Sequence, residues 1–255
     1  MGKVIAVVNQ KGGVGKTTTS VSISSMLGEA GYRVLAIDAD QQGGLSSGYG
    51  IRGKDREYTL YDIFSKDASM DEVILPSRYY NVSVVSSNIA LASVERDIIT
   101  TIDDSEYHIL KKNIEMVKDR YDYIIIDCQP SIGIVTINAL VAADMILIPV
   151  QCEYYAMEGF CRLTKILELI EERLEHRFEQ IGILLTMFDS RCKLCDEVEK
   201  DIRENAGYKV FKTKIPRNVR LAEAPSFEMP INVYSPRSSG AKAYREFVYE
   251  LLGKE

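Results

Sequence analysis

The sequence of 255 residues lacks the features that mark a membrane-spanning or secreted protein. No apolar run approaches the length needed to cross a bilayer. Residues 1–8 read as a short strand that leads directly into a glycine-rich segment, which leaves no room for a cleavable signal. The five cysteines are odd in number and irregularly spaced, so no disulfide framework is indicated. We therefore expect a cytoplasmic protein with reduced thiols.

An excess of positive charge is also missing. The chain has 31 basic and 37 acidic residues, a net charge of −6, so the molecule as a whole repels polyanions. Binding of nucleic acid would therefore need a local basic patch. One candidate lies between Tyr208 and Ala222, where no acidic residue interrupts a set of five cations: Lys209, Lys212, Lys214, Arg217 and Arg220. Such a run can equally form an ordinary solvated face.

Low-complexity segments and internal repeats are absent as well. With 46% hydrophobic and 27% charged residues, the composition is close to the globular average. A chain of this length can bury one large core, so we expect a single domain over residues 1–255. Residues 50–80 and 207–240 are less regular, and the second segment carries four prolines. We expect both to be loop-rich excursions rather than linkers between domains.

Short apolar runs alternate with segments of helical spacing along the chain. Six continuous, β-branched runs predict strands that are buried on both faces: Val4–Val8, Val34–Ile37, Val82–Val85, Tyr123–Ile126, Met145–Val150 and Ile181–Leu185. The predicted helices are Thr17–Glu29, Ile109–Arg120, Val135–Ala142, Met157–Leu174, Cys192–Asn205 and Ala241–Leu252. This alternation predicts an α/β fold with a doubly wound, mostly parallel sheet and helices on both faces. Ligands of such sheets bind at the carboxyl ends of the strands.

A glycine-rich segment follows the first predicted strand and precedes the first predicted helix. The glycines of Gly12–Gly15 allow backbone amides to turn inward and bind phosphates at the helix N-terminus. Lys16 would reach the β- and γ-phosphates, and the Thr17 hydroxyl would bind magnesium. The strict phosphate-loop pattern has a glycine where this chain has Gln10. We expect residues 9–18 to form a nucleotide site; the alternative is a glycine-rich turn that binds no nucleotide.

Carboxylates stand at the ends of two further predicted strands. Asp38 and Asp40 leave the second strand two residues apart, where they can hold magnesium-bound water and orient an attacking water. Asp127 follows Tyr123–Ile126, the arrangement of a Walker B strand whose terminal carboxylate binds magnesium. A strand-terminal aspartate can instead cap a helix. The predicted metal site therefore consists of these three aspartates and Thr17.

The run Lys11–Thr18, Lys-Gly-Gly-Val-Gly-Lys-Thr-Thr, resembles the deviant Walker A motif of the ParA/MinD family of P-loop ATPases. Four further segments resemble the Soj/ParA chromosome-partition branch of that family: residues 38–44, 127–131, 149–159 and 215–226. The resemblance covers nearly the whole chain. It departs from the family at Gln41 and Gln129, where the family has prolines in its two switch regions.

The resemblance implies an ATPase that uses ATP and magnesium. Lys11 would cross the interface of an ATP-sandwiched homodimer and contact the partner's phosphates. Asp40 would be needed for hydrolysis. Together with Lys16 of the phosphate loop, these two residues are the expected catalytic residues. Residues 216–218 would flank the adenine. The full set of expected nucleotide-binding residues is Lys11, Gly12, Gly13, Val14, Gly15, Lys16, Thr17, Thr18, Pro216, Arg217 and Asn218.

The resemblance also implies partners. Members of the family bind double-stranded DNA without sequence preference once ATP has made the dimer, and the matching arginines here are Arg191 and Arg220. Contacts of arginine to phosphate give affinity without sequence readout. A ParB-like protein would stimulate hydrolysis and release the DNA. We therefore expect a nucleoid-associated partition ATPase that binds no membrane.

Three alternatives remain. Cys192 and Cys195 form a Cys-x-x-Cys pair like that of the related Mrp-type iron–sulfur carriers, and a dimer could join two such pairs into a four-thiolate site. A MinD-like positioning ATPase would need a basic, amphipathic C-terminal helix, which Tyr244–Glu255 does not provide. A metabolic P-loop ligase would need a substrate pocket that the sequence does not reveal.

Overall fold

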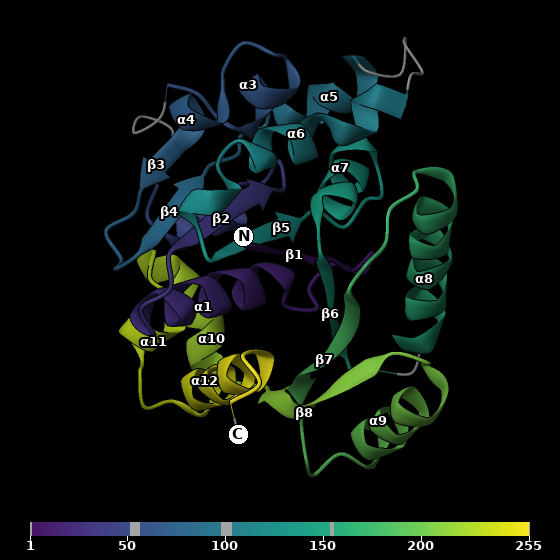
Figure 1. The fold of residues 1–255 in the computed structure, drawn as a ribbon. Helices are drawn as coiled ribbons and strands as arrows, with labels where there is room; N and C mark the ends of the chain where they lie inside the picture. Colours follow the sequence, from purple (N-terminus) through teal and green to yellow (C-terminus); the bar gives the residue numbers. More distant parts are fainter. Residues whose placement is uncertain (1, 52–56, 98–103, 154–155, 255) are drawn as a thin grey trace.

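A single eight-stranded sheet organises the protein (Figure 1). The computed structural model describes residues 2–51, 57–97, 104–153 and 156–254. The strand order is β3-β4-β2-β5-β1-β6-β7-β8, and every pairing is parallel except that between β3 and β4. The strands are β1 (Lys3–Val7), β2 (Val34–Ala39), β3 (Ile74–Pro76), β4 (Val82–Val85), β5 (Tyr123–Cys128), β6 (Met145–Gln151), β7 (Gln180–Phe188) and β8 (Lys209–Pro216). The predicted doubly wound, mostly parallel sheet is confirmed.

Helices cover both faces of the sheet. One core lies under α3 (Leu60–Phe64), α4 (Met70–Val73), α5 (Leu91–Asp97), α6 (Ile109–Glu115), α7 (Ile134–Ala142), α8 (Ala156–Arg173) and α9 (Lys193–Asn205). The other lies under α1 (Lys16–Glu29), α2 (Gly44–Gly48), α10 (Val219–Glu223), α11 (Ile231–Tyr234) and α12 (Ser239–Leu251). Because the sheet is continuous from β3 to β8, we propose that residues 1–255 form the single domain expected from the sequence.

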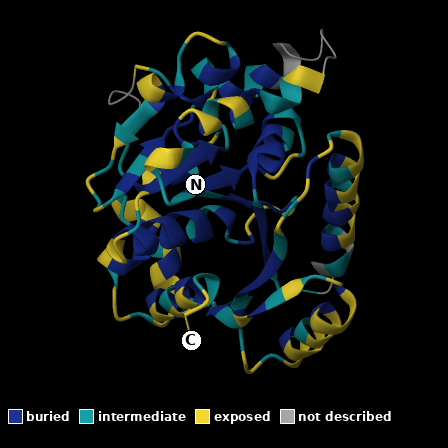
Figure 2. Cartoon of the chain, in the orientation of Figure 1, coloured by how far each residue is buried: buried dark blue, intermediate teal, exposed yellow. Residues whose placement is uncertain are grey.

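The central strands are apolar on both faces because each face packs against helices. In β1, Val4 and Ala6 belong to one core while Ile5 and Val7 belong to the other, and all four are fully buried. Figure 2 shows the same pattern across the middle of the sheet, whereas exposed residues lie on the outer helix surfaces, in the loops and on the edge strands. Burial on both sides is the reason that the strands read as continuous rather than alternating apolar runs.

Residues 207–240 contain more regular structure than expected. The prediction of a loop-rich excursion missed β8, an edge strand of eight residues. The strand is hard to recognise in the sequence, because three lysines interrupt the apolar pattern: Lys209, Lys212 and Lys214. Only Phe211 and Ile215 of this strand are buried. Charged side chains on an edge strand hinder pairing with other chains. After β8 the prolines do limit helix length, since α10 and α11 have five and four residues.

Two smaller differences concern the other half of the sheet. Residues 50–80, also expected to be loop-rich, contain α3, α4 and the short antiparallel strand β3. The helix expected over Ile109–Arg120 ends at Glu115, and residues 118–120 form a separate 3₁₀ turn.

Candidate nucleotide-binding site

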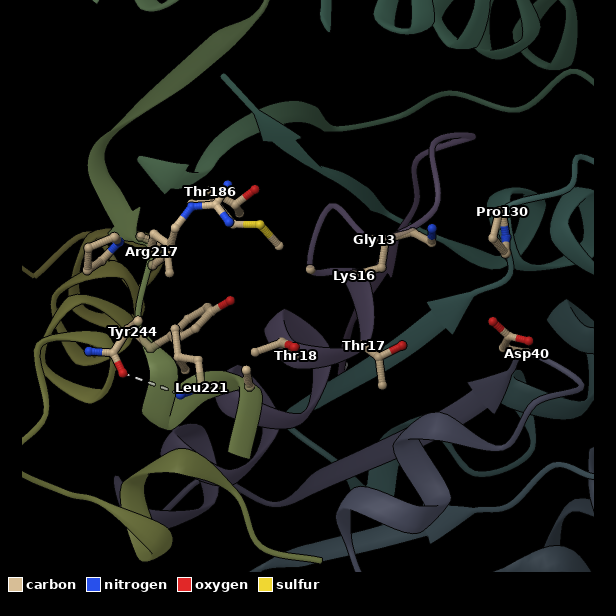
Figure 3. Close-up of a pocket in the computed structure, with 16 residues that line it drawn as sticks. Gly13, Lys16, Thr17, Thr18, Asp40, Pro130, Thr186, Arg217, Leu221 and Tyr244 are labelled. Atoms are coloured by element: carbon tan, nitrogen blue, oxygen red, sulfur yellow. Dashed lines mark hydrogen bonds between the residues drawn. The ribbon is translucent and has the colours of Figure 1, made fainter. Parts of the chain in front are cut away.

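A cavity of about 460 Å³ opens at the carboxyl edge of the sheet, where the sequence motifs were expected to meet. Lys16, Thr17 and Thr18 form its middle (Figure 3). Asp40 and Pro130 lie on one side of these residues, and Arg217 and Tyr244 lie on the other (Figure 3). The remaining lining residues are Gly13, Gly15, Thr186, Met187, Ile215, Pro216, Asn218, Leu221 and Ala222. The phosphate loop therefore separates an acidic end of the cavity from a more apolar end.

The phosphate loop has a backbone that only glycine adopts without strain. Gly13 and Gly15 have φ angles of +76° and +90°, in the left-handed region. A Cβ atom at either position would meet nothing within 4 Å, so conformation rather than space requires glycine there. Gly15 is the N-cap of α1, which directs the first amides of that helix toward the cavity. The loop is thus built to bind an anion.

The side chains of Asn9 and Thr186 fix this loop to the sheet. The side chain of Asn9 accepts a hydrogen bond from the Lys11 amide (2.9 Å) and donates one to the Pro149 carbonyl (2.8 Å). The Thr186 hydroxyl, at the end of β7, donates to the Val14 carbonyl (2.8 Å). Neither contact was expected from the sequence. Asn9 lies within the motif, but nothing in the sequence pairs Thr186 with a residue so far away along the chain.

Lys16 places a buried ammonium group at the centre of the site. Lys16 is only 7% exposed, and its Nζ donates a hydrogen bond to the Lys11 carbonyl at 3.1 Å. Burial lowers the pKa of this lysine, while the carboxylates of Asp127 and Asp40 act in the opposite direction. A buried charge is costly unless it is paired, so an anionic ligand in the cavity would stabilise it. The predicted contact with phosphate fits this environment.

Asp38 holds the loop after β2 together. Its Oδ2 accepts hydrogen bonds from the Ser46 amide (2.8 Å) and hydroxyl (2.7 Å), and its Oδ1 accepts one from the Asp40 amide (3.2 Å). Burial raises the pKa of Asp38 to about 6. Asp38 was expected to bind metal, but it does not line the cavity and both of its carboxylate oxygens already accept hydrogen bonds. We propose that it acts by positioning Asp40, which does line the cavity.

Asp127 offers an oxygen atom without a protein partner. It pairs in register with Asp38 across β5 and β2 and is fully buried. Its Oδ1 accepts a hydrogen bond from the Ser20 hydroxyl at 2.9 Å. Its buried Oδ2 has no hydrogen-bond partner among the residues that the structure describes. The pKa of Asp127 is raised to about 7, mainly by burial and to a lesser extent by the nearby charge of Asp38.

These residues fit a magnesium ion that arrives with a nucleotide. Among the described residues, no group of three or more histidine, cysteine or acidic side chains could hold a metal by itself. Magnesium, however, commonly uses one or two protein groups together with phosphate oxygens and water. The orphaned Oδ2 of Asp127 and the cavity-lining side chains of Thr17 and Asp40 suit that arrangement.

The buried Asp127 predicts a pH effect on stability without ligand. Because its pKa in the folded state is about 7, the folded state holds a proton that the unfolded chain releases near pH 4. Wild-type stability should therefore fall relative to that of Asp127→Asn as pH rises from about 4 to about 7. Urea unfolding of both proteins, free of nucleotide and magnesium, measures the difference. A difference that is independent of pH would contradict the prediction.

Lys11 points to a different partner from Lys16. Its Nζ forms an ion pair with Glu153, two residues beyond β6, and both side chains are partly exposed. Lys11 is not among the residues that line the cavity. The structure thus brings Lys16 and Asp40 together around the cavity, while it leaves Lys11 on the rim.

The apolar end of the cavity is formed by the segment after β8. Pro216, Arg217 and Asn218, the expected neighbours of adenine, all line it. The Asn218 side chain caps α10 by accepting from the amides of residues 220 and 221 (2.8 and 3.3 Å), so it also shapes the wall. Tyr244 of α12 was not expected here; its hydroxyl is 2.9 Å from that of Thr19 on α1.

The two expected DNA-binding arginines lie at the surface. Arg191 forms a bidentate ion pair with Asp189, and Arg220 pairs with Glu223 at 2.8 Å. Lys214, from the basic stretch, is bound to Glu199 at 2.8 Å and lies over the ring of Phe188. Arg217 lines the cavity. The stretch between Tyr208 and Ala222 therefore does not form one uniform basic face.

The fold and the phosphate loop define a P-loop nucleotide-binding protein. Residues 2–180 match a family model described as an AAA domain. The chain is 47% identical over 251 residues to the sporulation initiation inhibitor protein Soj of Bacillus subtilis, covering 98% of both chains. It is 40% identical to the chromosome-partitioning ATPase Soj of Treponema pallidum, covering all of this chain and 99% of the relative. The chain belongs to the Soj/ParA family of chromosome-partitioning proteins.

A solved structure supports the nature of the ligand. The fold superimposes with a TM-score of 0.86 on a protein described as cobyrinic acid a,c-diamide synthase from Mycobacterium smegmatis with bound ATP analogue and magnesium. The two chains are 30% identical, and the match covers 99% of this chain and 94% of the other. That similar protein therefore binds an ATP analogue and magnesium on the same fold.

Proposed function

We propose that this chain is a DNA-partition switch driven by ATP. ATP and magnesium occupy the cavity, two copies of the chain close on the nucleotides, and the dimer binds double-stranded DNA without sequence preference. Hydrolysis, stimulated by a ParB-like partner, then releases the DNA. The observation that carries this proposal is the pair of lysines in one phosphate loop, with Lys16 inside the cavity and Lys11 outside it.

The residues of the cavity divide the work of hydrolysis. The amides of Gly13–Thr18 and the ammonium of Lys16 hold the phosphate chain and neutralise charge that develops on the γ-phosphoryl group. A bound magnesium ion would supply positive charge that offsets the charge of the phosphate chain. Thr17 and Asp127 would hold it. Asp40 accepts a hydrogen bond from the Gln42 amide (2.9 Å) and would orient the attacking water.

Lys11 is suited to act on the other copy. Its side chain is paired with Glu153 and does not line the cavity of its own chain, whereas a second copy closing on that side would present its phosphates. Lys11 would first have to leave Glu153. A partly exposed ion pair such as this one stabilises the protein by at most about 1 kcal/mol. Charge-assisted hydrogen bonds from Lys11 to a phosphate chain are stronger and can therefore replace it.

The alternatives have less support. Cys195 is buried and donates to the Cys152 carbonyl at 3.8 Å, so a cluster that joined two chains would require it to move. Against MinD-like anchoring, the apolar face of α12 is packed in the core through Tyr244, Phe247 and Val248. No described helix has the length and apolarity to cross a membrane. The similarity to the diamide synthase, at 30% identity, is lower than that to the Soj proteins.

DNA binding measured with three nucleotide states tests the proposal. We expect tight binding with ATP and a non-hydrolysable analogue and weak binding with ADP, since only the triphosphate joins the two copies. Light scattering of the same samples reports the dimer. Equal binding in all three states would refute the switch, even if ATP itself binds.

Arg220→Glu should weaken DNA binding of the ATP-bound protein while leaving dimerisation intact. Loss of one phosphate contact per chain should lower the slope of log affinity against log salt by about 1 for each chain. Fluorescence anisotropy over a salt series measures this slope. Arg177→Glu is the matched control, because Arg177 is exposed and pairs with an acidic neighbour, as Arg220 does, but is not one of the candidate arginines. An equal effect of both variants would indicate that only net charge matters.

A further inference from the structure

Two thiols that the nucleotide site does not use lie together at the start of α9. Cys192 is the N-cap residue of this helix, and Cys195 follows one turn later. The Cys195 amide donates a hydrogen bond to the Cys192 carbonyl at 2.9 Å, so the two residues are one helical turn apart and their side chains lie on the same side of the helix. Residues one helical turn apart have Cα atoms within the roughly 4.4–6.8 Å that a disulfide spans, so rotation of the two side chains can bring the sulfur atoms into bonding range.

The two sulfur atoms differ in their access to solvent. Cys192 is partly exposed, whereas Cys195 is 6% exposed, and its sulfur donates to the Cys152 carbonyl at 3.8 Å. Burial raises the pKa of the Cys195 thiol. A small reagent can therefore reach Cys192 first, while Cys195 lies behind it and can react only with a group already attached to Cys192.

We propose that Cys192 and Cys195 form a dithiol site that exchanges with small disulfides such as oxidised glutathione. The Cys192 thiolate attacks one sulfur of the glutathione disulfide, and the first glutathione leaves as a thiolate that takes up a proton. The Cys195 thiolate then attacks the Cys192 sulfur, the mixed disulfide breaks, and the second glutathione leaves. The protein dithiol is oxidised by two electrons, and one disulfide is reduced to two thiols.

The other cysteines are not suited to this reaction. Cys128 and Cys152 are buried, and burial raises both pKa values, that of Cys152 to about 12. Cys161 is exposed on α8 and would react with glutathione as a single thiol. The site does not depend on the proposed partition function, because thiol–disulfide exchange needs neither ATP nor DNA. Its test is therefore separate from that of the switch.

Mass spectrometry of variants in a Cys161→Ser background tests the site. Folded protein is treated with excess oxidised glutathione and a metal chelator, quenched in acid, denatured and alkylated. The background protein should lose two alkylatable thiols without gaining mass from glutathione, and a reductant should restore them. Adding Cys195→Ser should trap one glutathione on Cys192. Adding Cys192→Ser should slow any modification by at least about 10-fold, because the remaining thiols are buried.

Two results would overturn the proposal. One is a stable glutathione adduct on the background protein, which would show that Cys195 does not resolve the mixed disulfide. The other is loss of two thiols at the same rate with Cys192→Ser, which would place the reaction elsewhere. Retention of the thermal unfolding midpoint in each variant confirms that the comparison is made between folded proteins.

Discussion

Replacing Lys16 with alanine should abolish ATP binding while the nucleotide-free protein stays folded. The ammonium donates charge-assisted hydrogen bonds to phosphate, each worth roughly 1.5–3 kcal/mol, so two of them correspond to a loss of affinity of about 100-fold or more. Stability should not suffer, because burial disfavours the charge of Lys16 when no anion is present. Isothermal titration with Mg-ATP and thermal unfolding with and without nucleotide measure both effects.

Lys11→Ala is the matched control for this experiment. It removes a lysine from the same loop, but from the rim rather than from the cavity. We expect nucleotide affinity to remain within about threefold of wild type, since no cavity contact is lost. The ATP-dependent dimer should disappear. If Lys16→Ala still binds ATP with an affinity near that of wild type, the assignment of the cavity is wrong.

Asp40→Ala should retain ATP and hold the protein on DNA. The loop after β2 remains anchored by Asp38 and Ser46, so the phosphate contacts are undisturbed. Loss of the group that orients water should reduce hydrolysis by roughly 10²–10⁴-fold. Because release depends on hydrolysis, the variant should stay bound when free ATP is removed. Phosphate release and the dissociation rate from immobilised DNA measure the two effects.

Asp40→Asn separates the carboxylate charge from the shape of the loop. The amide oxygen can still accept from the Gln42 amide, so the loop keeps its conformation. Hydrolysis should be lost as in Asp40→Ala. An asparagine variant that hydrolyses ATP at the wild-type rate would show that Asp40 only supports the loop. Fast release of either variant from DNA would show that release does not depend on hydrolysis.

Much of the fold could be predicted because its strands are buried on both faces. Continuous β-branched runs such as Val34–Ile37 have few alternatives to a strand in the middle of a parallel sheet. The edge strand β8 was missed for the converse reason. Its lysines contact solvent or, in the case of Lys214, pair with Glu199 instead of packing in a core. Their positions therefore show no hydrophobic periodicity from which a strand could be predicted. Prolines nearby made a loop the natural expectation.

The candidate site was predictable where a motif is local. The conformation of Gly13 and Gly15 and the position of Lys16 follow from neighbours within a few residues, so a sequence pattern can describe them. Thr186 and Tyr244 could not be found this way. Each contacts the phosphate loop or α1 across a large separation in the chain, and threonine and tyrosine are too common to serve as a signal.

The sequence by itself determined the family, the layered α/β architecture and the residues that would face phosphate. Local backbone preference and the burial of apolar runs depend on residue type, which the sequence states directly. Only the tertiary structure decided what the charged groups do. Asp38 turns both oxygens to neighbouring amides and a hydroxyl, Asp127 keeps one oxygen without a protein partner, and Lys11 lies on the rim beside Glu153. The role of a charge depends on the atoms around it, and packing of distant segments places those atoms.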